Sequence, residues 1–376
     1  MEKAIGISVK DHFSSLPDPR ILRKTHHKLV DVIVIALCAI IAGADDWVEV
    51  AAFGKEKEHW FKTFLELPSG IPSHDTFGRV FALINPEEFG KCFMNWIRNV
   101  FPMSDSDTIA IDGKTARHSH DRANRKSAIH MVSAWAVRNH LILGQVKTDD
   151  KSNEITAIPE LLKTLDLNGC VVTTDAMGCQ KDIAEQIIDQ GGDYVFSLKG
   201  NQGNLHKEVQ LLFEDAKNEG YKDLPHETCT TVEGGHGRIE TRCYTITDDV
   251  DWFEEKSKWK KLTTFAMVES TREIGDQTTR ETRYFISSLP CDVKRFAEAA
   301  RGHWGIENGL HWCLDISFRE DDSRVRNGHA PENLAIIRRF ALSLIKNDPQ
   351  RKIGVKASRK RAGWSNAYLL HLLRLA

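Results

Sequence analysis

The chain has 376 residues, enough for two to three domains and a substantial core, and its 51 Lys and Arg residues against 53 Asp and Glu give a net charge of −2. A total so near neutrality excludes a protein that is basic or acidic throughout. Eight cysteines without a CxxC pair exclude a disulfide framework and a cysteine-rich zinc module, and they predict a reduced, cytoplasmic protein.

Basic charge is concentrated near the two ends of the chain. Between positions 338 and 376 Lys and Arg far outnumber acids, and the early stretch DPRILRKTHHK holds a second group, Arg20, Arg23, Lys24 and Lys28. Such patches on a neutral chain suit a polyanion partner, although a solvated tail is the alternative explanation for any single charge run.

The first hundred residues have the pattern of helices. The most apolar run, VIVIALCAIIAGA at 32–44, is about 13 residues long and too short to span a bilayer, so it predicts a buried helix. Ser73 or Asp75 is a suitable N-cap for a later helix. We expect a helical domain over 1–104, no signal peptide and no membrane partner.

The pattern changes to strands after position 104. Segments 108–112, 128–137 and 141–148 predict a meander, followed by a helix, a strand at 171–175, a helix at 180–190 and a strand at 194–200. This order requires a mixed α/β sheet and is the order of the ribonuclease-H fold. Asp112 and Asp175 stand at strand ends, where α/β sheets bind ligands.

A β-rich insertion is predicted over 204–290. It begins with a helix and continues with three alternating segments, GRIETRCYTIT, KLTTFAMVESTRE and TRETRYFISSL, which predict an antiparallel sheet. Helices return over 292–315 and, with an amphipathic pattern, over 330–347. The predicted catalytic domain therefore combines 105–203 with 291–347, and 348–376 forms a basic C-terminal tail.

The stretch RGHWGIENGLHWCLD places four titratable residues at intervals of four: His303, Glu307, His311 and Asp315. On a helix they share one flank, either as a surface ladder of charge pairs or as part of a site. Glu307 with two strand-end aspartates would form an oxygen-ligand site for Mg²⁺, suited to phosphodiester chemistry. For Asp175 a helix cap is the alternative, and the absence of HExxH spacing disfavours zinc.

Several longer motifs resemble those of one family. They are IPSHDTFGRVF, IAIDGKTAR, TTDAMGCQK, HGRIETR, RGHWGIENGLHWCLD and FREDDSRVRNGHAPENLA. Together they resemble the DDE transposases of bacterial insertion sequences, in the branch that includes the H-repeat-associated proteins of Rhs elements. The resemblance implies a ribonuclease-H-like domain with a β-rich insertion, with Asp112, Asp175 and Glu307 as catalytic residues and as ligands of Mg²⁺, for which Mn²⁺ can substitute.

The resemblance also implies a reaction and its partners. Hydrolysis at a transposon end frees a 3′-hydroxyl, which then attacks target DNA by transesterification. The partners are double-stranded DNA, as transposon inverted repeats and as target, and a second copy of the chain in a homodimer on DNA. Two other hypotheses remain: a metal-dependent endonuclease without strand transfer, and an inactive or domesticated DNA-binding relic.

This sequence departs from a signature found in many members of the superfamily. Where they carry a Tyr, an Arg and a Lys around the glutamate, it has Ala300, His303 and Leu314. Either His303 or Arg301 is a candidate for the missing phosphate clamp. The tryptophans Trp304 and Trp312 are expected to pack in the core rather than to stack on bases.

Further basic residues are candidates for DNA contacts. Lys114 and Lys199 follow strand ends near the predicted site, with a solvated lysine as the alternative for each. Arg238 and Arg242 share one face of a strand with His236 and Glu240, with surface ion pairs as the alternative. Arg20, Arg23 and Lys24 are candidates for recognition of the transposon end by helices in a major groove.

Overall fold

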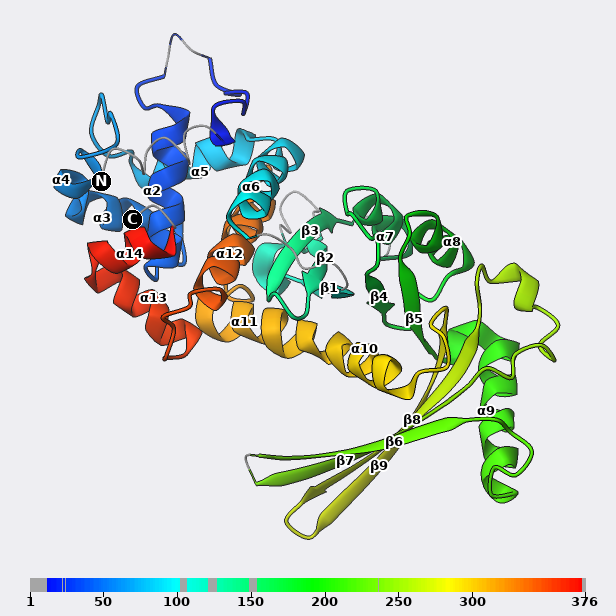
Figure 1. The fold of residues 1–376 in the computed structure, drawn as a ribbon. Coiled ribbons are helices and arrows are strands. Elements are labelled where there is room, and N and C mark those ends of the chain that lie inside the picture. Colours follow the sequence, from blue (N-terminus) through cyan, green and yellow to red (C-terminus); the bar gives the residue numbers. More distant parts are fainter. Residues whose placement is uncertain are drawn as a thin grey trace.

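The computed structural model describes residues 12–21, 23, 25–101, 107–120, 127–148, 154–235 and 237–373. Figure 1 shows three regions in a row: a group of helices that contains the first and last described segments, a sheet with flanking helices, and a long β arm at the far end.

The N-terminal region is helical, as predicted. Its helices are α2 (Leu29–Ile41), α3 (Trp47–Glu56), α4 (Glu58–Phe61), α5 (His74–Leu83) and α6 (Pro86–Val100). Every residue of α2 except Val30 is buried, which confirms the buried helix. Ser73 caps α5 by accepting a hydrogen bond from the Thr76 N–H. Among the described residues, no helix combines the length and apolarity needed to cross a membrane.

The first five strands form the predicted mixed sheet. They are β1 (Thr108–Thr115), β2 (His130–Ala136), β3 (Leu141–Lys147), β4 (Val171–Thr174) and β5 (Asp193–Leu198), in the spatial order β3-β2-β1-β4-β5. β1 runs antiparallel to β2 and parallel to β4, and β4 runs parallel to β5. The crossover helices are α7 (Glu154–Leu162) and α8 (Lys181–Asp189).

The predicted insertion begins with helix α9 (Gly203–Asn218) and forms an antiparallel arm of four strands. These are β6 (Glu227–Gly235), β7 (Arg238–Thr247), β8 (Thr264–Ile274) and β9 (Gln277–Ser287). β9 pairs with β5, so the arm continues the first sheet and all nine strands form one sheet. The prediction omitted β6 because its polar, exposed sequence ETCTTVEGG has no apolar alternation.

The helix predicted over 292–315 is confirmed, but it is not a regular α-helix throughout. Helix α10 (Val293–Ile306) passes into a π-helical segment, η5 (Glu307–His311), and then into α11 (Trp312–Phe318). A π segment contains one extra residue per turn and has no distinct sequence pattern, so periodicity alone could not locate it.

Helix α12 (Ala330–Lys346) lies between the N-terminal helices and the sheet (Figure 1). It contacts α2, α5 and α6 on one side and β3 on the other. The prediction that it is amphipathic is wrong: it is buried almost all round, including Arg338 and Arg339. Because α12 serves both regions, the helical region and the sheet share one hydrophobic core.

The C-terminal segment is also more ordered than the predicted basic tail. It forms α13 (Val355–Trp364) and α14 (Asn366–Leu372), and α13 packs on α2, α11 and α12. Arg359 is buried and donates hydrogen bonds to the carbonyl oxygens of Ile40 and Ala44, at 2.9 Å each. Part of the C-terminal positive charge therefore holds elements together and is not available to a polyanion.

Candidate active site

Asp112 and Asp175 lie side by side at one end of the sheet. The last parallel pair between β1 and β4 joins Ile111 to Thr174, and the two aspartates are the next residues along each segment. Asp175 directly follows β4, but the prediction that Asp112 ends its strand is wrong, because β1 continues to Thr115 and Asp112 pairs with Ser133 of β2. Asp112 Oδ1 accepts the N–H of Gly113 at 2.9 Å. Asp175 Oδ1 accepts the N–H of Met177 at 2.8 Å. Asp175 thus caps a tight turn rather than helix α8, which begins only at Lys181.

The Asp112 carboxyl is surrounded by other carboxylates. Burial, followed by the charge of Glu154, raises the pKa of Asp112 to about 7, and the charges of Asp175 and Glu307 add to the rise. The hydrogen bond from Gly113 opposes it. Glu307 and both aspartates are therefore close enough to repel one another, as carboxylates do when they share a site without a cation.

Glu307 opens the π-helical segment. The Trp312 N–H bonds to the Glu307 carbonyl, five residues back, which defines the wider turn. Gly309 allows this turn to lie close to the sheet, since a Cβ there would lie 3.2 Å from the buried ring of Trp135 on β2. The Glu307 side chain is exposed to solvent.

The wider turn separates the four residues that were expected on one flank. His303 faces β4, where its Nδ1 lies 3.1 Å from Thr173 Oγ1. Burial lowers the pKa of His303 to about 4, so the ring is neutral at pH 7. His311 Nδ1 lies 3.5 Å from Asp112 Oδ2, and burial lowers the pKa of His311 to about 3. This contact is therefore not an ion pair at neutral pH.

Two further residues at the site, Glu154 and His130, were not predicted. His130 Nε2 and Glu154 Oε1 share a hydrogen bond of 2.8 Å beside the backbone of Gly113. A Cβ on Gly113 would lie 2.2 Å from both atoms, so a side chain after Asp112 would displace this pair. In the sequence, Glu154 stands at the start of the helix that follows β3. Acidic residues are common in the first turn of any helix, so this position did not indicate a role at the site.

The two lysines predicted near the site have different environments. Lys114 is buried and pairs with Asp315 at 2.8 Å and with Asp321 at 3.5 Å, so it is neither solvated nor open to a phosphate. Lys199 is exposed directly after β5, and its charge contributes to lowering the pKa of His303. Of the two, Lys199 has the accessible ammonium group at this edge.

The N-terminal basic residues are only partly available. Arg20 donates to both carboxylate oxygens of Asp18, at 2.8 and 2.6 Å, and its side chain is mostly buried. Arg23 is exposed. Lys24 lies outside the described residues.

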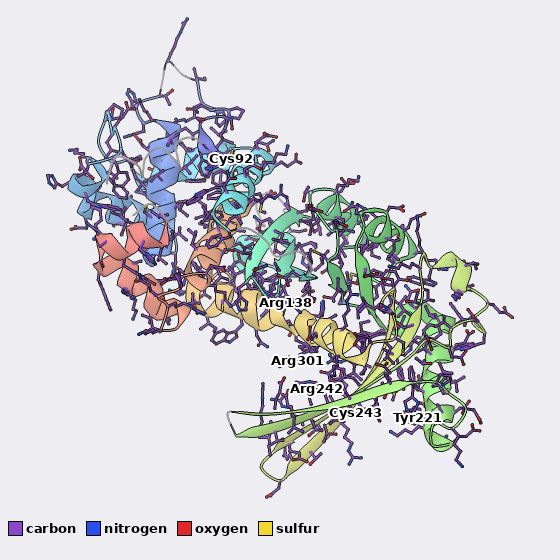
Figure 2. The ribbon with its side chains drawn as sticks, viewed as in Figure 1. Cys92, Arg138, Tyr221, Arg242, Cys243 and Arg301 are labelled. Atoms are coloured by element: carbon purple, nitrogen blue, oxygen red, sulfur yellow. The ribbon has the colours of Figure 1, made fainter. Side chains whose placement is uncertain are left out.

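A groove of about 450 Å³ lies between the β arm and α10, and we call it the arginine groove. Six arginines and three glutamates line it; the arginines are Arg238, Arg242, Arg272, Arg280, Arg283 and Arg301. In Figure 2, Arg301 on α10 and Arg242 on β7 lie on facing sides of the space between these elements. Trp304, Glu307 and Asn308 complete the α10 side.

The two tryptophans of α10 and α11 differ from each other. Trp304 is half-buried in the arginine groove, whereas Trp312 is 58% exposed, so the prediction that Trp312 packs in the core is wrong. His236 lies outside the described residues, but Arg238, Glu240 and Arg242 share one face of β7 as predicted, and all three line the groove.

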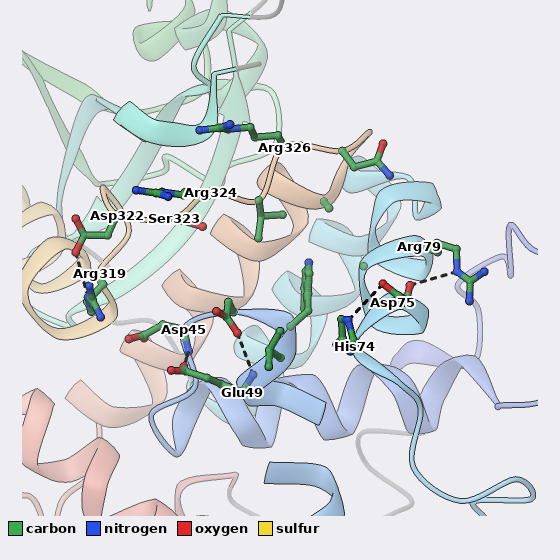
Figure 3. Close-up of a pocket in the computed structure, with 17 residues that line it drawn as sticks. Asp45, Glu49, His74, Asp75, Arg79, Arg319, Asp322, Ser323, Arg324 and Arg326 are labelled. Carbon is green, nitrogen blue, oxygen red and sulfur yellow. Dashed lines mark hydrogen bonds and ion pairs between the residues drawn. The ribbon is translucent and has the colours of Figure 1, made fainter. Parts of the chain in front are cut away.

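A second cavity of about 550 Å³ lies between α3, α5 and the loop after α11 (Figure 3). Five acids and four arginines line it, so its charges nearly cancel. Arg319 pairs with Asp322 at 3.0 Å, and Arg326 donates to the His118 carbonyl at 3.2 Å. This cavity has no excess charge that would select a polyanion.

The carboxylates at the sheet edge have the donor chemistry of a Mg²⁺ site, because hard divalent ions prefer oxygen ligands. The mutual repulsion at Asp112 is the kind of strain that a cation relieves. Within the described part of the chain, however, no three His, Cys, Asp or Glu side chains converge on one point. The residues thus match the ion in chemistry, and Glu307 would have to approach the aspartates to complete a site.

Comparison with known proteins adds the family. Residues 103–344 match the model described as "Transposase DDE domain", and residues 10–97 match "DDE_Tnp_1-associated". The chain is 42% identical to "H repeat-associated putative transposase YhhI" of Escherichia coli K12, over 96% of this chain and 97% of that one. It is 43% identical to "Putative transposase YncI" of Escherichia coli O157:H7, over 97% and 94%.

Among solved structures, a piggyBac transposase synaptic complex with hairpin DNA covers 99% of this chain and 78% of its own. The TM-score is 0.41 and the identity 10%, a similarity too low to identify a shared fold.

Proposed function

This chain belongs to the DDE transposase family, in the branch of the H-repeat-associated proteins, and from this we propose that it cuts DNA at transposon ends and joins the freed end to a target. The observation that carries the proposal is the pair Asp112 and Asp175, side by side where the parallel pairing of β1 with β4 stops, with the charge of Glu307 in range. The order of β1 to β5 supports a ribonuclease-H-like catalytic domain.

In this proposal Asp112, Asp175 and Glu307 would hold Mg²⁺ or Mn²⁺. Bound there, the ion would supply Lewis-acid activation of the attacking oxygen and would stabilise charge on the leaving oxygen. Asp175 is held through Oδ1 by the N–H groups of Met177 and Gly178 in its turn. Neutral His311 lies against Asp112 without competing for its charge. Lys199 is placed to meet a phosphate at the same edge.

The partners follow from the reaction. The substrates are double-stranded DNA, with inverted repeats at the transposon ends and a separate target. Two copies of the chain would act together as a homodimer that holds both ends. Because the substrate is bacterial chromosomal DNA, the site of action would be the cytoplasm.

The test uses a supercoiled plasmid that carries the flanking DNA of the gene, incubated with purified protein and Mg²⁺ or Mn²⁺. We expect nicked and joined products from the unmodified protein and none from Asp112→Asn, Asp175→Asn or Glu307→Gln. Asp251→Asn, at an exposed acid of the insertion, is the control. Cleavage that survives in the triad variants would contradict the proposal. Cleavage without joining would favour an endonuclease, and DNA binding without cleavage would favour a relic.

A further inference from the structure

The arginine groove is formed by strand register and helix periodicity. On β7, the side chains of Arg238, Glu240 and Arg242 alternate onto one face. Arg272 of β8 stands opposite Glu240, which places it on the same face. Across the groove, Arg301 and Trp304 are three residues apart on α10 and share one side of the helix.

Two glutamates hold the arginines in position. Glu233 of β6 accepts hydrogen bonds from Arg242 at 3.1 Å and from Arg301 at 2.9 Å, so it connects the arm to α10. Glu240 lies 3.3 Å from Arg238 and 3.7 Å from Arg272. The guanidinium groups of these four arginines are therefore held before any ligand arrives, and the arginines that line the groove outnumber the lining acids six to three.

The groove also contains a flat aromatic surface. The guanidinium of Arg283 lies 4.3 Å from the ring centre of Trp304. A nucleobase would stack on this ring face by displacing the guanidinium, and basic channels with aromatic side chains are how proteins bind single strands without sequence preference.

The size of the groove selects the form of nucleic acid. A volume of about 450 Å³ lies in the range of small-molecule sites and admits about one nucleotide of a single strand at a time. A duplex is far larger than this volume and could not enter it. Glu307 and Asn308 also line the groove, so an occupant would adjoin one of the proposed catalytic carboxylates, Glu307.

We propose that the arginine groove binds an unpaired DNA strand next to the phosphodiester that is cut, with phosphates on the arginines and a base on Trp304. The inference rests on the proposed function for the identity of the DNA. It adds to the proposed function that part of the DNA substrate is single-stranded when bound and that this part lies in the arginine groove.

The test measures binding of a fluorescein-labelled oligothymidylate of about ten nucleotides to the full chain by anisotropy, without divalent ion, against a duplex of equal length. We expect Arg238→Gln and Arg272→Gln each to reduce the slope of log affinity against log salt by about 0.7 for the single strand. Trp304→Leu should weaken binding roughly 5- to 100-fold with the slope unchanged. Duplex binding should change little in all three.

Two more variants complete the design. Arg295→Gln removes the same charge from α10 but outside the lining of the groove, where Arg295 pairs with Asp193, and it should leave binding unchanged. Glu233→Gln should tighten single-strand binding about two- to fivefold, because it releases Arg242 and Arg301 from a competitor. This gain cannot come from a variant that has failed to fold.

Three results would overturn the inference. One is single-strand affinity that is equal in the groove variants and in Arg295→Gln. Another is an equal loss of single-strand and duplex binding, which would make the groove a duplex-backbone surface. The third is a loss in the arginine variants but none in Trp304→Leu, which would indicate general anion binding. This binding test does not measure cleavage. If single-strand binding depends on the groove but the protein cuts no DNA, the proposed function is contradicted and the inference about the groove still holds.

Discussion

The carboxyl group of Asp112 lies in an environment that opposes its ionisation. Its pKa is raised to about 7 by burial and then by Glu154, Asp175 and Glu307, whereas an aspartate in the unfolded chain titrates near 3.8. A raised carboxyl pKa means that stability is lost as pH rises from about 3.8 to about 7 and that the loss is complete above that. The shift corresponds to roughly 4 kcal/mol in the protein without metal.

Asp112→Asn is therefore expected to stabilise the metal-free protein at pH 8, by up to roughly 4 kcal/mol, and to have little effect near pH 4. Urea unfolding at the two pH values in the presence of a chelator would measure this. Asp251→Asn, at a 90% exposed side chain, should show no such pH dependence. A destabilised Asp112→Asn at pH 8 would show that the carboxylate has a compensating partner.

Glu154 is the largest single charge acting on Asp112, so Glu154→Gln should move the Asp112 pKa down toward its ordinary value. The Asp112 carboxyl can be titrated by carbon NMR in the metal-free protein. Glu160→Gln, at an exposed position on the same helix, is the matched control. An unchanged Asp112 titration in Glu154→Gln would place Glu154 farther away than the structure has it.

For single residues, the sequence predicts a role only where the residue has a defined place relative to a predicted strand or helix. Asp112 and Asp175 could be predicted because each follows a short apolar run, and the chain order indicates that β1 and β4 are neighbours. Glu154 and His130 could not, since their proximity depends on how α7 and β2 meet beside Gly113. The burial of Lys114 and Arg20 also depends on partners that single positions do not reveal.

At the scale of elements, the π-helical segment depends on close packing against β2. Gly309→Ala should destabilise the protein by about 1–3 kcal/mol, because the new Cβ would press on the fully buried ring of Trp135 at 3.2 Å. Thermal unfolding would measure the loss. Gly234→Ala on the exposed β6, where the new Cβ would contact nothing within 4 Å, should be close to neutral. Equal effects of the two changes would contradict the packing argument.

Elements with strong periodicity were predictable, and those without it were not. The alternation in β7, β8 and β9 and the apolar run of α2 correspond to observed elements. Strand β6 exposes nearly every residue and forms only because β7 supplies a hydrogen-bonding edge. The change from α10 to η5 follows from packing on Trp135, which no local pattern encodes.

At the scale of the whole molecule, α12 and α13 join the helical region to the sheet. Arg359 on α13 donates to carbonyl oxygens of Ile40 and Ala44 and pairs with Asp45 at 3.0 Å. It also donates to the Ser317 carbonyl at the end of α11. The sequence shows Arg359 only as one charge in a basic run, and charge runs do not distinguish buried from solvated arginines.

Arg359→Leu should therefore lower the free energy of unfolding by about 3 kcal/mol or more, because it leaves several buried carbonyls and Asp45 without a partner. Arg351→Leu removes the same charge from an exposed position and should change stability by about 0.5 kcal/mol or less. Both can be compared by urea unfolding. If the two variants are equally stable, Arg359 does not hold the C-terminal segment to the rest of the protein, and the prediction of a solvated tail is the better description.

The pairing of β9 with both β5 and β8 has a geometric consequence. Backbone hydrogen bonds run without a linker from the strand that precedes Lys199 to the arm that carries the arginine groove. A hydrogen-bonded ladder of this kind resists bending within the sheet. A DNA strand bound in the arginine groove would therefore lie at a fixed distance from Asp175. Lengthening the strands would then move the point of cleavage along the DNA, where a flexible tether would only have slowed the reaction.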